Sequence, residues 1–191
     1  LIADGNVTSL DWSPVRETLA GAAKKRVRLW QMKSGADVAQ ALVELPFAAS
    51  HQSTINTVRW ATHGRGLASG DDLGVVKMWS TQQPGPVCFL ETGRALHGLD
   101  MSADRQWIAV GTENGQVLVW NTTTQSLLHE FAMGNAPVNC LAWRPGGGGS
   151  FACADKQGQI QFFDSPKGAA KAVPGHEGEI WQMVWRLMAG C

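Results

Sequence analysis

Residues 55–79 read INTVRWATHGRGLASGDDLGVVKMW and contain three short apolar blocks separated by turn-forming residues. The blocks are INTVRW from Ile55, LASGD from Leu67 and VKMW ending at Trp79. Blocks of this length, joined by turns that contain Gly and Asp, are typical of antiparallel strands connected by hairpins. The stretch therefore predicts a meander of three strands, here called a, b and c. We expect a fourth, strand d, in the variable tract after strand c.

The strand a block recurs along the chain at a nearly constant period. Its copies begin at residues 7, 55, 96, 138 and 180, which are 48, 41, 42 and 42 residues apart. The sixth residue of every copy is Trp, except for Met101 in the third. Blocks b and c follow each of the first four copies, and the fourth strand c ends in an aromatic, Phe163, instead of Trp. A period of about 40 residues indicates a repeat architecture.

A glycine-rich stretch in the fourth repeat, RPGGGGSFACAD at residues 144–155, resembles a flexible linker. It lies between the Trp of strand a and the start of strand b, where the other copies hold PVRET, THGRG and ADRQ. Glycine supplies positive φ in tight turns at little steric cost. We therefore predict that Gly146–Ser150 is a turn within a blade, and that residues 1–191 form a single repeat array.

These segments resemble the WD-repeat family. LASGDDLGVVKMW and GTENGQVLVWN are similar to the family's b–c portion, FFD to its Trp-Asp ending, and PGHEGEI to its Gly-His entry. The resemblance implies an all-β propeller, in which Trp residues of strands a and c pack between blades. It implies four complete four-stranded blades plus the first strand of a fifth, as part of a larger propeller. Completion would come from missing blades or another subunit.

The turn positions depart from the family pattern. The positions that correspond to the family's buried turn Asp are occupied by Lys24, Leu73, Asn114 and Gln157. We therefore expect the family's buried hydrogen-bond network to be incomplete, with Asp71 and Asp72 both lying in a solvated turn.

Composition and charge exclude several classes of function. Sixteen basic and sixteen acidic residues give a formal net charge of zero, so no global field attracts nucleic acid or an anionic membrane. No apolar run reaches the length of a membrane span. The four cysteines lack the spacing of a metal site or a disulfide scaffold. These features predict an intracellular protein, cytoplasmic or nuclear, with reduced thiols.

Motifs of catalysis are missing from the sequence. No Gly-Lys-Ser/Thr follows Gly146–Gly149, no G-x-S-x-G nucleophile elbow occurs, and the five histidines are not paired at the close spacing of a metal site. We predict no enzyme activity, no cofactor and no metal.

The remaining candidates for function are the b–c and d–a connections, which share one end of the blades. Their polar residues are predicted to form a rim that binds proteins or peptides: His51, Asp71, Asp72, Arg94, Glu113, Asn114, Asp155, Lys156, His176 and Glu177. A basic patch of Lys24, Lys25 and Arg26 lies on the same rim. The predicted function is a non-catalytic scaffold within a multisubunit complex. The alternative is association with chromatin or nucleic acid through the basic turn Lys24–Arg28.

Overall fold

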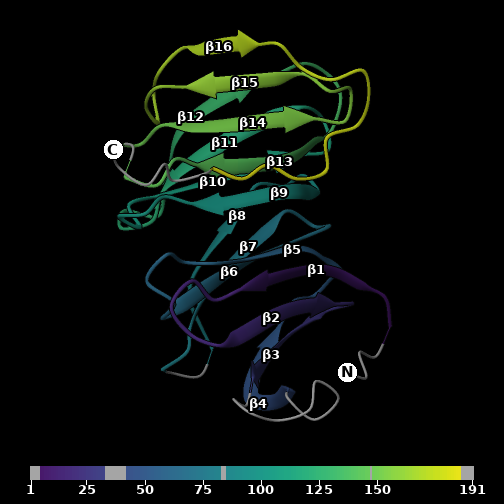
Figure 1. Ribbon diagram of the computed structural model, residues 1–191, viewed down its shortest axis with the longest axis vertical. Coiled ribbons are helices and arrows are strands. Elements are labelled where there is room, and N and C mark those ends of the chain that lie inside the picture. The colour runs from purple at the N-terminus through teal and green to yellow at the C-terminus, as the bar shows by residue number, and fades with distance from the viewer. Residues whose placement is uncertain (1–4, 33–41, 83–84, 147, 186–191) are drawn as a thin grey trace, which may run out of the picture. The chain divides into compact units, whose positions relative to one another are not determined.

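The computed structural model describes residues 5–32, 42–82, 85–146 and 148–185, which form sixteen β-strands and no helix. The strands make four antiparallel sheets of four strands each, and within every sheet the strands lie side by side in chain order (Figure 1). The predicted all-β fold of four-stranded blades is therefore confirmed. The four sheets are β1–β4 (Val7–Trp12, Thr18–Ala23, Arg26–Met32, Leu42–Ser50), β5–β8 (Ile55–Trp60, Gly66–Asp71, Val75–Ser80, Pro86–Glu91), β9–β12 (Leu96–Met101, Trp107–Thr112, Gln116–Asn121, Ser126–Ala132) and β13–β16 (Val138–Trp143, Phe151–Asp155, Ile160–Phe163, Ala170–Val173).

The chain divides into two compact units, Leu1–Leu96 and His97–Cys191. In the first unit, the core gathers small and β-branched side chains from both sheets, including Ala20, Val27, Ile55 and Val58. Such residues fit the closely packed faces of two sheets. The two sheets of the first unit therefore share one hydrophobic core.

Strands β1 and β5 of the first unit are joined by hydrogen bonds that involve the repeated Trp of strand a. The Trp60 backbone N–H donates to Oδ2 of Asp11 at 2.6 Å, and the Trp60 indole Nε1 donates to the Asp11 carbonyl at 3.1 Å. Ser9 Oγ accepts a bond from the Val58 N–H at 3.2 Å. The Trp of one strand a is thus fixed against the preceding strand a.

The second unit repeats this arrangement. Trp143 donates its backbone N–H to Oδ2 of Asp100 at 2.7 Å and its Nε1 to the Asp100 carbonyl at 3.0 Å. Residues 180–185, expected to form a fifth strand a, are not paired as a strand within the described chain. They still dock in the same manner, because Trp185 Nε1 donates to the Ala142 carbonyl at 2.9 Å.

The glycine-rich stretch connects β13 to β14, which are neighbours in one sheet. The Arg144 N–H donates to the Ser150 carbonyl at 2.9 Å. Gly146, Gly148 and Gly149 all have positive φ, and no atom lies within 4 Å of a Cβ placed at Gly146 or Gly148. There is therefore open space beside Gly146 and Gly148, whereas a Cβ at Gly149 would lie 2.7 Å from Cδ of Pro166.

Removal of Gly146 should leave the fold nearly unchanged, because an exposed turn tip tolerates alteration better than a strand does. We expect the free energy of unfolding to change by less than about 0.5 kcal/mol. Thermal unfolding followed by circular dichroism would measure this, and a loss of cooperative unfolding would contradict it.

Candidate protein-binding surface

The b–c and d–a connections carry most of the exposed polar residues that the sequence nominated. In the first unit Lys24, Lys25, Arg26 and Asp72 are exposed and Arg94 is half-buried. In the second unit the exposed members are Glu113, Asn114, Lys156, His176 and Glu177. Ten of the predicted rim residues are therefore accessible to a partner, nine of them exposed and Arg94 half-buried.

Three of the nominated residues are buried, so their predicted exposure on the rim is wrong. The exposed fractions are 4% for His51, 0% for Asp71 and 1% for Asp155. Asp71 is the last residue of β6, and its Oδ1 accepts the N–H groups of Leu73 at 3.0 Å and Val75 at 2.9 Å. The carboxylate therefore turns inward to hold the hairpin, and only Asp72 reaches solvent.

The other Asp71 oxygen begins a buried chain of hydrogen bonds. His51 Nδ1 lies 2.8 Å from Asp71 Oδ2, and His51 Nε2 lies 2.7 Å from Ser69 Oγ. Ser69 Oγ also accepts a bond from Trp79 Nε1 at 2.8 Å. Since Nδ1 donates to a carboxylate, the Ser69 hydroxyl is left to donate to Nε2 of a neutral imidazole. This series of hydrogen bonds links strands b and c, here β6 and β7, to the loop before β5.

The expectation that this network is incomplete is therefore wrong for the β5–β8 sheet. The network carboxylate is two residues before Leu73, at the last position of strand b. The signal was in the sequence, because LASGD and FACAD both end in Asp and IAVGT ends in Thr. An acceptor side chain at this position can accept hydrogen bonds from the N–H groups of the turn that follows it.

The other turns keep only part of the network. Thr112 Oγ1 accepts the Gln116 N–H at 3.1 Å, and Asp155 Oδ1 accepts the Gln157 and Gln159 N–H groups at 2.9 Å each. Asp155 Oδ2 is buried without a partner, and the position that corresponds to His51 in this repeat, four residues before strand a, is Gly134. Turn closure is thus shared by three sheets, while the complete network occurs in the β5–β8 sheet.

The Ser69–His51–Asp71 order resembles a nucleophilic triad, but its surroundings give it a structural role. Ser69 is 0% exposed and its oxygen is already held by an indole donor. A nucleophile must be reached by its substrate. Cys153 is likewise buried, and burial raises the pKa of its thiol, which keeps it protonated and unreactive. Among the described residues, no group of three His, Cys, Asp or Glu could hold a metal ion.

Acidification should destabilise the fold through His51. Burial lowers the pKa of His51, and the hydrogen bond that His51 donates to Asp71 opposes this only in part. A histidine with a lowered folded-state pKa stabilises the fold above its unfolded pKa of about 6.5, and this contribution is lost as the pH falls further. The slope is at most about 1.4 kcal/mol per pH unit.

Urea unfolding at pH 7.5 and pH 5.5 would test this. His51→Gln should show a smaller loss of stability between the two pH values than the parent chain, whereas His97→Gln, at an exposed position, should match the parent. Equal pH dependence in the parent and His51→Gln would contradict the assignment.

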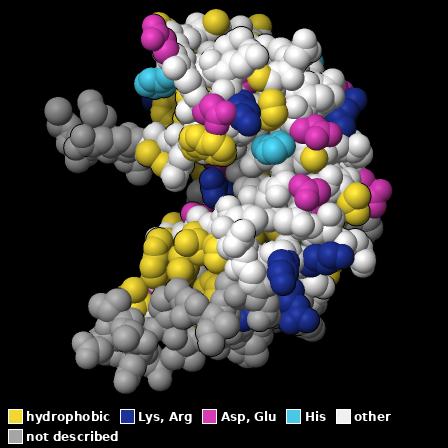
Figure 2. All heavy atoms as spheres, turned by 90° about the vertical axis from the view of Figure 1, so that its right-hand side faces the viewer, with side chains coloured by type: hydrophobic (Ala, Val, Ile, Leu, Met, Phe, Trp, Pro, Cys, Tyr) yellow, Lys and Arg dark blue, Asp and Glu magenta, His cyan; other side chains and the backbone are white. Residues whose placement is uncertain are grey.

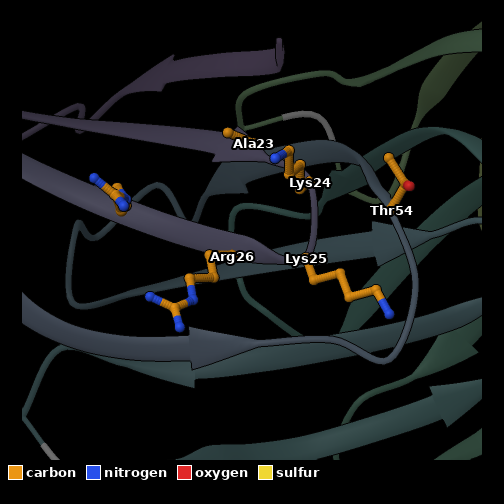
Figure 3. Close-up of a pocket in the computed structure, with 6 residues that line it drawn as sticks. Ala23, Lys24, Lys25, Arg26 and Thr54 are labelled. Atoms are coloured by element: carbon orange, nitrogen blue, oxygen red, sulfur yellow. The ribbon is translucent and has the colours of Figure 1, made fainter. Parts of the chain in front are cut away.

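The basic turn between β2 and β3 borders a pocket of about 500 Å³ lined by Ala23, Lys24, Lys25, Arg26, Arg28 and Thr54 (Figure 3). In Figure 1 strand β2 ends on the right, the side that faces the viewer in Figure 2. Figure 2 shows a group of Lys and Arg side chains with no Asp or Glu between them. Lys24, Lys25 and Arg26 are all exposed beside the pocket and form a locally positive surface on a chain of zero net charge.

Comparisons with protein families agree with this architecture. Residues 101–188 match the model of the anaphase-promoting complex subunit 4 WD40 domain, and residues 2–31 and 45–80 match that of the WD domain, G-beta repeat. The crystal structure of RRP9 WD40 repeats superposes with a TM-score of 0.78 at 20% identity, covering 94% of this chain and 54% of that one. The chain belongs to the WD-repeat family.

Curated relatives are similar over parts of their length. The small ribosomal subunit protein RACK1 of Medicago sativa is 28% identical over 82 residues, which are 43% of this chain and 25% of that protein. Cell division cycle 20.1, cofactor of APC complex, of Arabidopsis thaliana is 27% identical over 151 residues, 74% of this chain and 31% of that protein. Target of rapamycin complex subunit wat1 of Schizosaccharomyces pombe is 22% identical over 162 residues, 74% of this chain and 50% of that protein.

The chain thus spans a quarter of the RACK1 relative and half or less of the other two. The WD-repeat fold is generally an interaction scaffold without catalysis, and neither matching model describes an enzyme family. No helix in the described ranges is long and apolar enough to cross a membrane.

Proposed function

We propose that this chain is part of a single WD-repeat propeller that acts as a non-catalytic, intracellular scaffold and binds other proteins within a multisubunit complex. The observation that carries the proposal is the rigid β6–β7 turn. Asp71 closes it from inside, while Asp72 and Leu73 face outward, with Leu73 59% exposed. A recognition turn that is already ordered loses little conformational entropy when it binds.

The relatives support the same class of function. One is a cofactor of the APC complex and another a subunit of the target of rapamycin complex. The exposed polar residues of the second unit, such as Glu113 and Lys156, would add contacts of both signs. Charge complementarity of this kind sets association rate and specificity more than affinity.

Purification of the full-length protein from its source after nuclease treatment would test the proposal. We expect protein partners in stoichiometric amounts and a particle larger than the free protein. Recovery of the free protein alone, or of partners found only when the nuclease is omitted, would refute it.

The basic turn supports a second candidate function, association with nucleic acid or chromatin. Lys24, Lys25 and Arg26 are all exposed within one hairpin. Affinity for generic DNA should then fall steeply with added salt and drop when these charges are removed. We expect binding no tighter than about 10⁻⁶–10⁻⁴ M at physiological salt, the nonspecific range.

A further inference from the structure

We propose that the pocket beside the β2–β3 turn binds an acidic peptide segment of a partner protein. This inference rests on the proposed scaffold function and names the chemistry of one partner contact. The pocket encloses about 500 Å³, within the range of about 300–1,000 Å³ typical of ligand sites. In Figure 3 the turn that carries Lys24 and Lys25 lies on one side of the pocket and Thr54 on another.

The walls of the pocket are held by backbone hydrogen bonds. The Ile55 N–H donates to the Lys24 carbonyl at 2.7 Å, and the His51 N–H donates to the Lys25 carbonyl at 2.8 Å. The Asp72 N–H donates to the Thr54 carbonyl at 3.0 Å. The loop before β5 is thus tied to both neighbouring turns, and the buried His51 side chain anchors it. The pocket is formed before any ligand arrives.

The three positive charges of the β2–β3 turn are not neutralised within the described chain. Lys24, Lys25 and Arg26 are exposed, and no ion pair links them to a carboxylate of a described residue. The two carboxylates of the adjacent β6–β7 turn are engaged elsewhere. Asp71 is bonded to His51, and Asp72 accepts a bond from Asn56 Nδ2 at 2.6 Å. An anionic ligand would therefore meet unpaired cations.

A peptide fits these features better than a nucleic acid does. Alternate residues of an extended strand lie about 6.6 Å apart on one face, so two or three carboxylates can reach the three cations of one hairpin. Proteins that bind DNA through its backbone commonly make about 6–10 phosphate contacts. Here the exposed cations that line the pocket are the three consecutive residues of one hairpin, Lys24, Lys25 and Arg26. A nucleic acid that made this many contacts would extend beyond the hairpin, whereas a short acidic segment would not.

Fluorescence anisotropy with a labelled hexaglutamate peptide and the full chain would test the inference. We expect binding at low salt that a hexaglutamine peptide does not show. Lys25→Gln combined with Arg26→Gln should raise the Kd about tenfold, which corresponds to about 1.4 kcal/mol. The matched control is Arg144→Gln with Lys167→Gln, which removes two exposed cations from the second unit and should change the Kd less than twofold.

Two results would overturn the inference: equal weakening by both double variants, or a single-stranded oligonucleotide that binds more tightly than hexaglutamate and depends on the same two residues. Thermal unfolding of each variant would show that folding is intact. If hexaglutamate fails to bind while nuclease-resistant protein partners are still recovered, this inference fails and the scaffold function stands.

Discussion

Replacement of Asp71 by alanine should lower the free energy of unfolding by about 3–4 kcal/mol. The change removes the acceptor for the Leu73 and Val75 N–H groups and for His51 Nδ1. A buried donor left without a partner costs about 1–3 kcal/mol, and the Asp71 side chain that would be removed is 0% exposed. Urea denaturation at pH 7.5 would measure the loss.

The neighbouring residue provides the matched control. Asp72→Ala also removes one carboxylate from this turn, but at an exposed position. It should lower the free energy of unfolding by less than about 0.5 kcal/mol. Equal destabilisation by the two variants would show that the turn does not depend on the buried network.

Phe151→Ala should destabilise the second unit by about 3–5 kcal/mol, the range for a large aromatic removed from a core. Phe151 is 0% exposed and is stacked on Phe163 with ring centres 4.5 Å apart and 6° between the ring planes. Its ring also lies 4.7 Å from that of Trp143. The lost contacts come from both neighbouring strands, β13 and β15, so the cavity has little freedom to close.

Leu127→Ala is the control for this prediction, because Leu127 is 45% exposed on β12. Its cost should stay below about 1 kcal/mol. Urea unfolding of both variants would compare them, and a loss at Phe151 no larger than at Leu127 would contradict the assigned core.

Strand positions were the part of the fold most accessible from sequence. The blocks that begin at residues 7, 55, 96 and 138 start β1, β5, β9 and β13, because alternating burial demands an apolar pattern at fixed spacing. The Trp at the end of each block has a second role, in hydrogen bonding, that the apolar pattern does not reveal. Trp60 and Trp143 bind the preceding strand a, whereas Trp12 is 48% exposed and the described residues hold no preceding strand a for it.

The candidate site was harder to predict, since burial in a turn depends on a single residue of register. Asp71 and Asp72 have identical chemistry, but Asp71 ends strand β6 and Asp72 begins the turn that follows it. The last position of β6 faces inward and the next faces solvent. The basic pocket was anticipated only as a charged turn, because its Thr54 wall comes from a loop that backbone hydrogen bonds bring to Lys24 and Lys25.

Site-specific photocrosslinking tests the protein-binding surface most directly. A photoreactive phenylalanine would replace Leu73 in the β6–β7 turn or, as the control, Val15 in the β1–β2 turn at the other end of the strands. Both side chains are apolar and 59% exposed, so the two probes differ in location and not in accessibility. In extracts of the source organism, we predict protein crosslinks from position 73 and few from position 15. Crosslinks to nucleic acid from position 73, or equal yields at the two positions, would contradict a protein-binding scaffold that uses this end of its blades.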